Sequence, residues 1–62
     1  MKYSELKKML RNNGCYKVSE GSNHETWFSP INNKKFPVGR HNSDDVPTGT
    51  YNTILKQSGI KE

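Results

Sequence analysis

The sequence predicts an α+β fold with the element order α-β-β-β-α, in which a three-stranded antiparallel sheet carries two helices on one face. Apolar residues recur at helical spacing near both ends of the chain, and three short strand-like runs separated by turn residues lie between them. Strands joined by short turns pair as an antiparallel meander. Because 62 residues make at most one small domain, residues 1–62, we expect the second face of the sheet to stay open.

The first helix is predicted over residues 4–13. Ser4 can cap it, because a serine hydroxyl accepts hydrogen bonds from the free amides of a first helical turn. Leu6, Met9 and Leu10 recur at helical spacing and mark its buried face. Gly14 follows Asn13 and ends the helix, since glycine adopts the left-handed conformation at low cost. The remaining faces are expected to meet water or a partner, and they carry Lys7, Lys8 and Arg11.

Three strands are predicted over residues 15–19, 23–29 and 35–38. The turns between them are Glu20-Gly21-Ser22 and the segment 30–34, both rich in turn-forming residues. Phe36 and Val38 share one face of the third strand. Pro37 lies between them and cannot donate a backbone hydrogen bond, so this strand is expected at an edge of the sheet.

The second helix follows a polar loop over residues 39–46. Pro47 suits a first helical turn, and Gly59 is placed to close the helix. Ile60 can then fold back onto the core. One face of this helix is marked by Tyr51, Ile54, Leu55 and Ser58.

Composition narrows the possible classes of protein. Cys15 is the single cysteine, so a framework of internal disulfides is excluded. Its position between a helix and a strand favours burial as a small apolar side chain. No apolar run reaches the length of a membrane span, and the N-terminus lacks the core of a signal peptide. These features predict a cytoplasmic protein without membrane association.

The charge points to a polyanionic partner. Ten Lys and Arg residues against six Asp and Glu give a net charge of +4, and eight of the ten basic residues lie in residues 1–43. A basic surface on a small domain suits a nucleic acid, although charge of this size can also serve solubility alone.

His24 is the strongest candidate for chemistry. It follows the Gly21-Ser22 turn and shares one strand face with Thr26 and Phe28, while Trp27 lies on the other face. If the large Trp27 ring points inward, His24 faces the open side and Phe28 offers a platform for stacking a base. The opposite register, with Phe28 buried, stays open on alternation alone.

An exposed imidazole can take and return a proton near neutral pH. RNA carries its own nucleophile, the ribose 2′-hydroxyl, so cleavage by this route needs no metal or other cofactor in principle. His41 could serve as a general acid or bind a phosphate, and either histidine could also be an ordinary surface residue. The sequence carries no convincing set of metal ligands, since one cysteine and two histidines seventeen residues apart do not match a zinc site.

Lys34, Lys35 and Arg40 bracket the third predicted strand and are candidates for binding RNA phosphates. A solvated hairpin tip is the alternative interpretation for these residues.

Taken in order, several segments resemble the HicA toxin family, the ribonuclease half of type II HicBA toxin–antitoxin pairs. The resemblance covers nearly the whole chain. It rests on the following matches: the helix segment 4–10, the stop at Gly14, GSNH at 21–24, PVGRH at 37–41 and ILKQSGI at 54–60.

The resemblance implies a fold like that of double-stranded RNA-binding domains and metal-independent cleavage of mRNA that arrests translation. It implies that His24 is the catalytic histidine, that Gly21 and Ser22 form the turn presenting it, and that His24 faces the open side. It also implies a HicB-type antitoxin partner and no direct DNA binding by this chain.

The chain departs from the family pattern at two places in this segment. Asn23 stands where many members have a first histidine, and Glu25 stands where an apolar residue is common. A carboxylate at position 25 could orient the imidazole or raise its basicity, or lie at the rim of the site. Two other classes of protein remain as alternatives. One is a noncatalytic RNA-binding module of the same fold, and the other is a protein-interaction domain.

Overall fold

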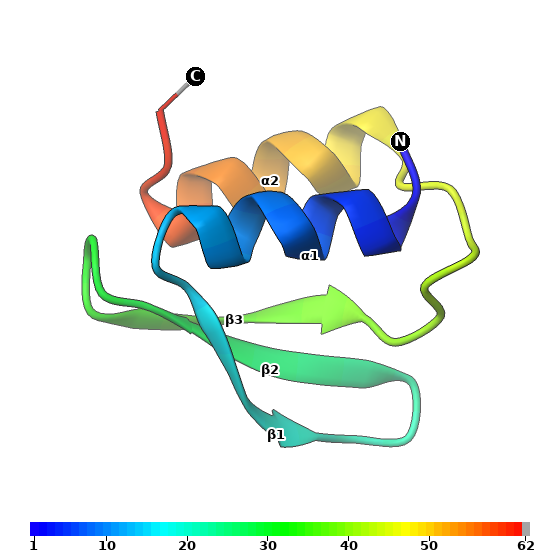
Figure 1. The fold of residues 1–62 in the computed structure, drawn as a ribbon, viewed down its shortest axis with the longest axis horizontal. Coiled ribbons are helices and arrows are strands. Elements are labelled where there is room, and N and C mark those ends of the chain that lie inside the picture. Colours follow the sequence, from blue (N-terminus) through cyan, green and yellow to red (C-terminus); the bar gives the residue numbers. More distant parts are fainter. Residues whose placement is uncertain (62) are drawn as a thin grey trace.

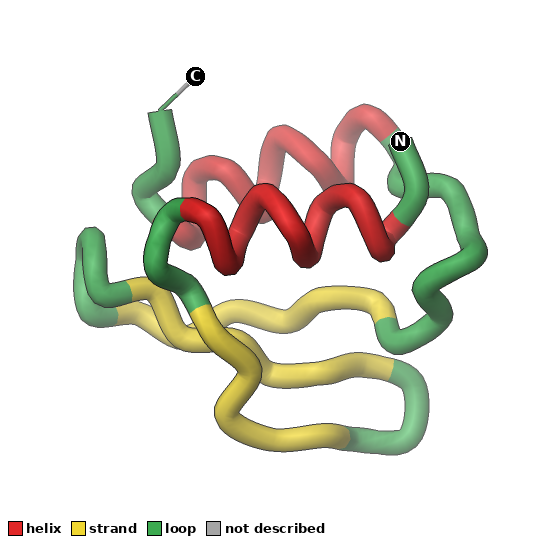
Figure 2. Tube along the Cα trace, in the orientation of Figure 1, coloured by secondary structure: helices red, strands yellow, loops and turns green. Residues whose placement is uncertain are grey.

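The computed structural model describes residues 1–61 and has the predicted element order (Figures 1 and 2). The elements are α1 (Tyr3–Asn12), β1 (Tyr16–Glu20), β2 (His24–Ser29), β3 (Lys34–Gly39) and α2 (Thr48–Ser58). The predicted α+β fold with the element order α-β-β-β-α is confirmed. No strand boundary differs from the predicted one by more than one residue. The predicted domain of residues 1–62 includes Glu62, which lies outside the described residues.

The two helices lie side by side on one face of the sheet and run in the same direction across it (Figure 1). The strands follow the order β1-β2-β3 and both pairs are antiparallel. Strand β3 is therefore an edge strand, which is where Pro37 can be accommodated, as predicted. The register shifts within β1 between Lys17 and Ser19, so the other edge of the sheet is irregular.

The start of α1 differs from the prediction. The helix begins at Tyr3 with Lys2 at the N-cap, and Ser4 lies inside the first turn, so the predicted Ser4 cap is wrong. The reason is that Lys2 forms a bridge with Asp45, and the Glu5 carboxylate accepts a hydrogen bond from the Lys2 amide at 2.9 Å. The end of the helix is as predicted, because Gly14 has a φ of +87°.

The core lies between the helices and the inner face of the sheet. Trp27 points inward with 2% of its surface exposed, and Phe36 and Val38 share its face. This confirms the register in which His24 faces away from the core. The buried apolar residues are Leu6, Leu10, Cys15, Trp27, Phe36, Val38, Ile54 and Ile60.

Helix α2 closes the fold over β3. Pro47 occupies the N-cap, one residue before the first helical turn in which it was predicted. Gly59 ends the helix with a φ of +75° and Ile60 folds back into the core, as predicted. The buried Ser29 hydroxyl donates a hydrogen bond to the carbonyl oxygen of Ser58, which ties the end of α2 to the end of β2. Within residues 1–61, neither helix is long and apolar enough to cross a membrane.

Candidate active site

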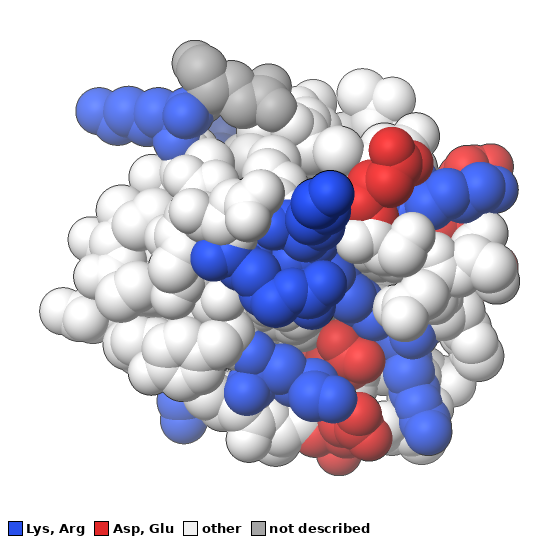
Figure 3. Space-filling model, in the orientation of Figure 1, with Lys and Arg blue, Asp and Glu red and all other residues white. Residues whose placement is uncertain are grey.

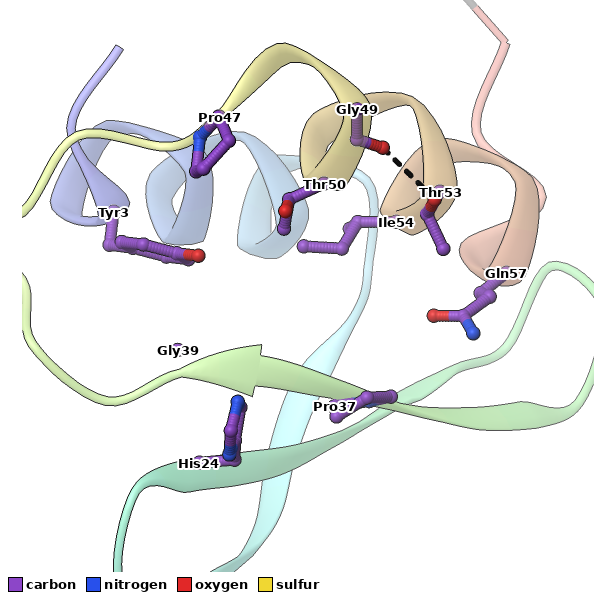
Figure 4. A pocket seen from close by; sticks show the side chains of 10 residues that line it. All are labelled: Tyr3, His24, Pro37, Gly39, Pro47, Gly49, Thr50, Thr53, Ile54 and Gln57. Carbon is purple, nitrogen blue, oxygen red and sulfur yellow. Dashed lines mark hydrogen bonds between the residues drawn. The ribbon is translucent and has the colours of Figure 1, made fainter.

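His24 is the first residue of β2 and is exposed. It pairs with Gly39, the last residue of β3, so its ring stands where a neighbouring strand has no side chain. In Figure 4 the imidazole rises from β2 toward the end of β3. The Gly21 amide donates a hydrogen bond of 2.7 Å to the His24 carbonyl oxygen, which closes the turn before the strand.

Arg40 joins this turn to the end of β3. Its amide donates to the Asn23 carbonyl oxygen at 3.3 Å, and its guanidinium Nη1 donates to the Ser22 carbonyl oxygen at 3.2 Å. Four of the residues singled out from the sequence are therefore neighbours in space. They are Gly21, Ser22, His24 and Arg40.

The predicted lysines lie at the opposite end of the sheet. Lys34 and Lys35 pair with Ser29 and Phe28, whereas His24 pairs with Gly39. At a rise of about 3.3 Å per residue, Lys35 is roughly 13 Å along the strand from Gly39. The two lysines could contact a long RNA strand, but they do not border the imidazole.

His41 is exposed in the loop after β3, where its carbonyl oxygen accepts a hydrogen bond from the Asp44 amide at 3.2 Å. His41 does not line the groove beside His24.

A groove of about 610 Å³ opens beside His24, between the end of β3 and α2 (Figure 4). Its wall on the α2 side was not predicted from the sequence. That wall includes three uncharged polar side chains, Thr50, Thr53 and Gln57, at helical spacing. The i, i+3, i+7 spacing of these side chains was visible in the sequence, but they lie beside the apolar face. Only the packing of α2 against β3 places them along the groove. The complete lining is Tyr3, His24, Pro37, Gly39, Pro47, Gly49, Thr50, Thr53, Ile54 and Gln57.

Tyr3 covers Gly39 at one end of the groove. A Cβ atom added to Gly39 would lie 2.7 Å from Cζ and 3.1 Å from the hydroxyl oxygen of Tyr3. The glycine therefore lets the Tyr3 ring rest on the backbone at the residue that pairs with His24. Tyr3 was also missed from the sequence, because it is distant along the chain from every other residue of the site.

Behind His24, on the inner face of β2, lies a buried ion pair. Glu25 Oε1 accepts from Lys7 Nζ at 3.1 Å and from Trp27 Nε1 at 3.0 Å, and both charged side chains are at most 10% exposed. Lys7 Nζ also donates to the Arg40 carbonyl oxygen at 3.3 Å and to Asn42 Oδ1 at 2.5 Å. All three protons of the ammonium thus have acceptors.

This pair corrects two expectations. Lys7 does not lie on a wet face of α1, because it is 4% exposed and anchored to β2 and to the loop after β3. Glu25 does not orient the His24 imidazole, since successive side chains of a strand point to opposite faces. Burial acts to raise the pKa of the Glu25 carboxyl, but the hydrogen bonds from Trp27 and Lys7 and the Lys7 charge outweigh it, so its pKa lies below the ordinary value.

The open face of the sheet carries an aromatic pair. Phe28 is half-buried, and its ring lies 5.6 Å from that of Tyr16, which is 51% exposed. Phe28 is therefore partly covered by a neighbour on this face.

Basic side chains gather over α1 at the centre of the face seen in Figure 3, with acidic side chains beside and below them. Three ion pairs join charges within residues 1–61, and they are Lys2–Asp45, Lys7–Glu25 and Lys17–Glu20. No three His, Cys, Asp or Glu side chains of the described chain are grouped so that they could hold a metal ion.

Fold and groove together define a small α+β protein whose candidate acid–base centre is one exposed imidazole. A family model described as "HicA toxin of bacterial toxin-antitoxin" matches residues 3–60. The chain is also 38% identical over 61 residues to a "Probable mRNA interferase HicA 2" of Photorhabdus laumondii subsp. laumondii, covering 98% of this chain and 100% of that protein. No solved structure matches the chain. The chain therefore belongs to the HicA toxin family of bacterial toxin–antitoxin systems.

Proposed function

We propose that this HicA toxin is an endoribonuclease that cleaves mRNA without a metal ion and thereby arrests translation, with His24 as the proton-transfer group. The observation that carries the proposal is the position of the imidazole, which is exposed beside a groove and follows a turn held by hydrogen bonds from Gly21 and Arg40. Membership of the toxin family and the likeness to a relative named as an mRNA interferase support the same activity.

In the proposed reaction the neutral His24 imidazole removes the proton of a ribose 2′-hydroxyl. The freed oxygen attacks the adjacent phosphorus, the bond from phosphorus to the 5′-oxygen breaks, and the departing oxygen takes up a proton. General acid–base assistance of this kind accelerates a reaction by about 10²–10⁴-fold. An exposed position suits His24 for this task, because the ring must reach a flexible polymer that arrives from solvent.

Arg40 is the cation best placed to hold a phosphate near His24. One nitrogen of its guanidinium already donates to the Ser22 carbonyl oxygen, which fixes the group beside the turn, and other N–H groups remain for phosphate oxygens. We propose that Lys34 and Lys35 contact RNA phosphates farther along the strand, at the other end of β3.

As a member of a toxin–antitoxin family, the chain is expected to have an antitoxin partner. We propose that this partner is a HicB-type protein, and that operator DNA is bound by the antitoxin rather than by this chain.

The proposal is tested with purified protein and mRNA in excess EDTA. We expect cleavage by the unmodified protein and by His41→Ala, and a loss of at least about 100-fold for His24→Ala. His41→Ala is a matched control, because it removes the second imidazole of the chain from an exposed loop. Thermal unfolding of His24→Ala should be unchanged, since the exposed ring contributes little to the core.

Two outcomes would contradict the proposal. Cleavage that stops in EDTA would contradict the metal-independent reaction. RNA binding without cleavage by the unmodified protein would favour a noncatalytic RNA-binding module of the same fold.

A further inference from the structure

The groove beside His24 has an unusual chemical character for a surface that meets RNA. Among the described residues that line it, none is a Lys, Arg, Asp or Glu. Phosphates are generally held by cations and backbone amides, so this lining does not suit them. The groove instead combines apolar surface from Pro37 and the Tyr3 ring with the neutral hydrogen-bonding groups of α2.

Its size and openness suit one small organic group. A volume of about 610 Å³ falls within the range of about 300–1,000 Å³ that is typical of pockets for small ligands. The groove is continuous with His24, which is one of its lining residues. A group bound there would therefore lie next to the atoms on which the imidazole acts.

The polar side chains of α2 offer a defined hydrogen-bonding pattern. In Figure 4 Thr50, Thr53 and Gln57 project from α2 on the side of the helix that faces β3. Thr53 Oγ1 donates its proton to the Gly49 carbonyl oxygen at 2.9 Å, so toward a ligand it can only accept. The exposed Gln57 amide presents an acceptor and two donor protons side by side, which matches the paired donors and acceptors on the edge of a base.

We propose that this groove is a nucleoside subsite, which takes the unpaired base and ribose of the RNA nucleotide next to the cleaved phosphate. Gln57 reads the edge of the base, Thr53 accepts a hydrogen bond from the base or the ribose, and Pro37 and the Tyr3 ring provide the apolar contact. The subsite rests on the proposed function, because the nucleotide is that of the RNA which His24 cleaves.

The subsite predicts a base preference that depends on Gln57. A pool of single-stranded RNA with random sequence is cleaved by the unmodified protein and its variants, and the bases that flank each cut are determined by sequencing. We expect a preference at one flanking position, and a decrease of roughly 5- to 100-fold in that preference for Gln57→Ala, the range for the loss of one bidentate base contact.

Asn52→Ala is the matched control for this experiment. Asn52 is also an exposed amide on α2, but it does not line the groove, so its removal should leave both the rate and the base preference unchanged. Thr53→Val is a second test variant, because it removes the hydroxyl and keeps the side-chain shape. Thermal unfolding of each variant shows that the fold is kept.

A second measurement concerns the pairing state of the RNA. The cleaved segment is annealed to a complementary RNA strand, or to a strand that leaves two nucleotides unpaired at the cut. A base that must enter the groove has to leave its pair, so full pairing should reduce cleavage on the order of 100-fold relative to the gapped complex.

The outcomes separate the subsite from the function on which it rests. In one outcome the unmodified protein cleaves RNA while Gln57→Ala and Thr53→Val keep the base preference of Asn52→Ala. That result would overturn the subsite and leave the ribonuclease activity as proposed. Equal cleavage of the paired and gapped complexes would overturn it as well. A protein that cleaves no RNA would overturn both.

Discussion

Lys7 illustrates how one buried side chain positions the candidate site. Its ammonium contacts Glu25 on β2 and the Arg40 and Asn42 positions after β3, and it therefore fixes the ends of both strands that border the groove. Glu25 immediately follows His24, so the ion pair also holds the backbone that carries the imidazole. The buried charge acts on the site through the position of the strands, without contact with a substrate.

Lys7→Met should destabilise the protein strongly, because it leaves the Glu25 carboxylate buried without its cation. Breaking a buried pair in this way costs about 3–5 kcal/mol in free energy of unfolding. Lys8→Met is the control, since Lys8 is the exposed neighbour on the same helix and its removal should change stability by less than about 0.5 kcal/mol. Urea unfolding measures both variants, and equal stabilities would contradict the role given to Lys7.

The same pair makes stability dependent on pH. The pKa of the Glu25 carboxyl is lowered in the folded protein from its ordinary value of 4.5, so the unfolded chain binds this proton more readily. The stabilisation is complete above pH 4.5 and is lost as the pH falls through the lowered pKa. We expect Glu25→Gln to be less stable at neutral pH and to show a shallower loss of stability on acidification, as measured by urea unfolding at a series of pH values. An acid slope identical to that of the unmodified protein would contradict this.

At the scale of elements, local pattern was sufficient to predict the fold. Leu6 and Leu10 on α1, the alternation through Trp27, and Gly14 and Gly59 at the helix ends each act over a few residues, and the structure bears them out. The start of α1 was predicted wrongly at Ser4 because a distant segment, the loop around Asp45, pairs with Lys2 and moves the helix start.

The residues predicted for the site are brought together where they share one segment or lie on adjacent paired strands. The Gly21-Ser22 turn and His24 form one segment, and Arg40 directly follows the strand that pairs with it. Lys7 could not be predicted as buried, because its acceptors come from two segments that are distant from it along the chain, β2 and the loop after β3. The α2 wall carries no charged side chain, and the helical spacing of Thr53 and Gln57 alone does not distinguish them from other exposed polar residues of the helix.

Close packing between α1 and β3 yields a prediction for a single glycine. In Gly39→Ala the added Cβ would lie 2.7 Å from Tyr3 Cζ, so the ring or the strand must move. We expect a loss of about 1–3 kcal/mol in the free energy of unfolding, the usual cost of overpacking.

Gly49→Ala is the matched control for this change. A Cβ at position 49 meets no atom within 4 Å, and alanine is favoured over glycine in a helix by up to about 1 kcal/mol. Urea unfolding of the two variants should therefore give changes of opposite sign. A Gly39→Ala protein as stable as the unmodified one would contradict the packing of Tyr3 against β3.

For the molecule as a whole, the proposed function assigns RNA binding to two different surfaces, one charged and one uncharged. The net charge of +4 attracts a polyanion, while the groove itself is lined by uncharged side chains and His24. Cations that could hold phosphates lie around it, with Arg40 at the turn and Lys34 and Lys35 at the far end of β3. Binding of the RNA backbone and reading of a base would thus take place on different parts of one surface.

Cleavage should accordingly depend on salt. Each phosphate contact with a single-stranded RNA contributes about −0.7 to the slope of log affinity against log salt concentration. We expect kcat/KM to fall as salt rises, and Lys34→Ala combined with Lys35→Ala to flatten that slope. The initial rate at low RNA concentration across a salt series measures this, and a rate independent of salt would argue against phosphate contacts.

The central claim is that His24 removes a proton from the 2′-hydroxyl of the RNA itself. The most direct test uses an RNA with one mapped cleavage site and the same RNA with a single 2′-deoxy nucleotide on the 5′ side of the cut. We expect the deoxy substitution to abolish cleavage at that site, and the unmodified RNA to yield a 2′,3′-cyclic phosphate end only when His24 is present. Continued cleavage at the deoxy nucleotide, or products that end in a 3′-hydroxyl, would show that water is the nucleophile and would contradict the account.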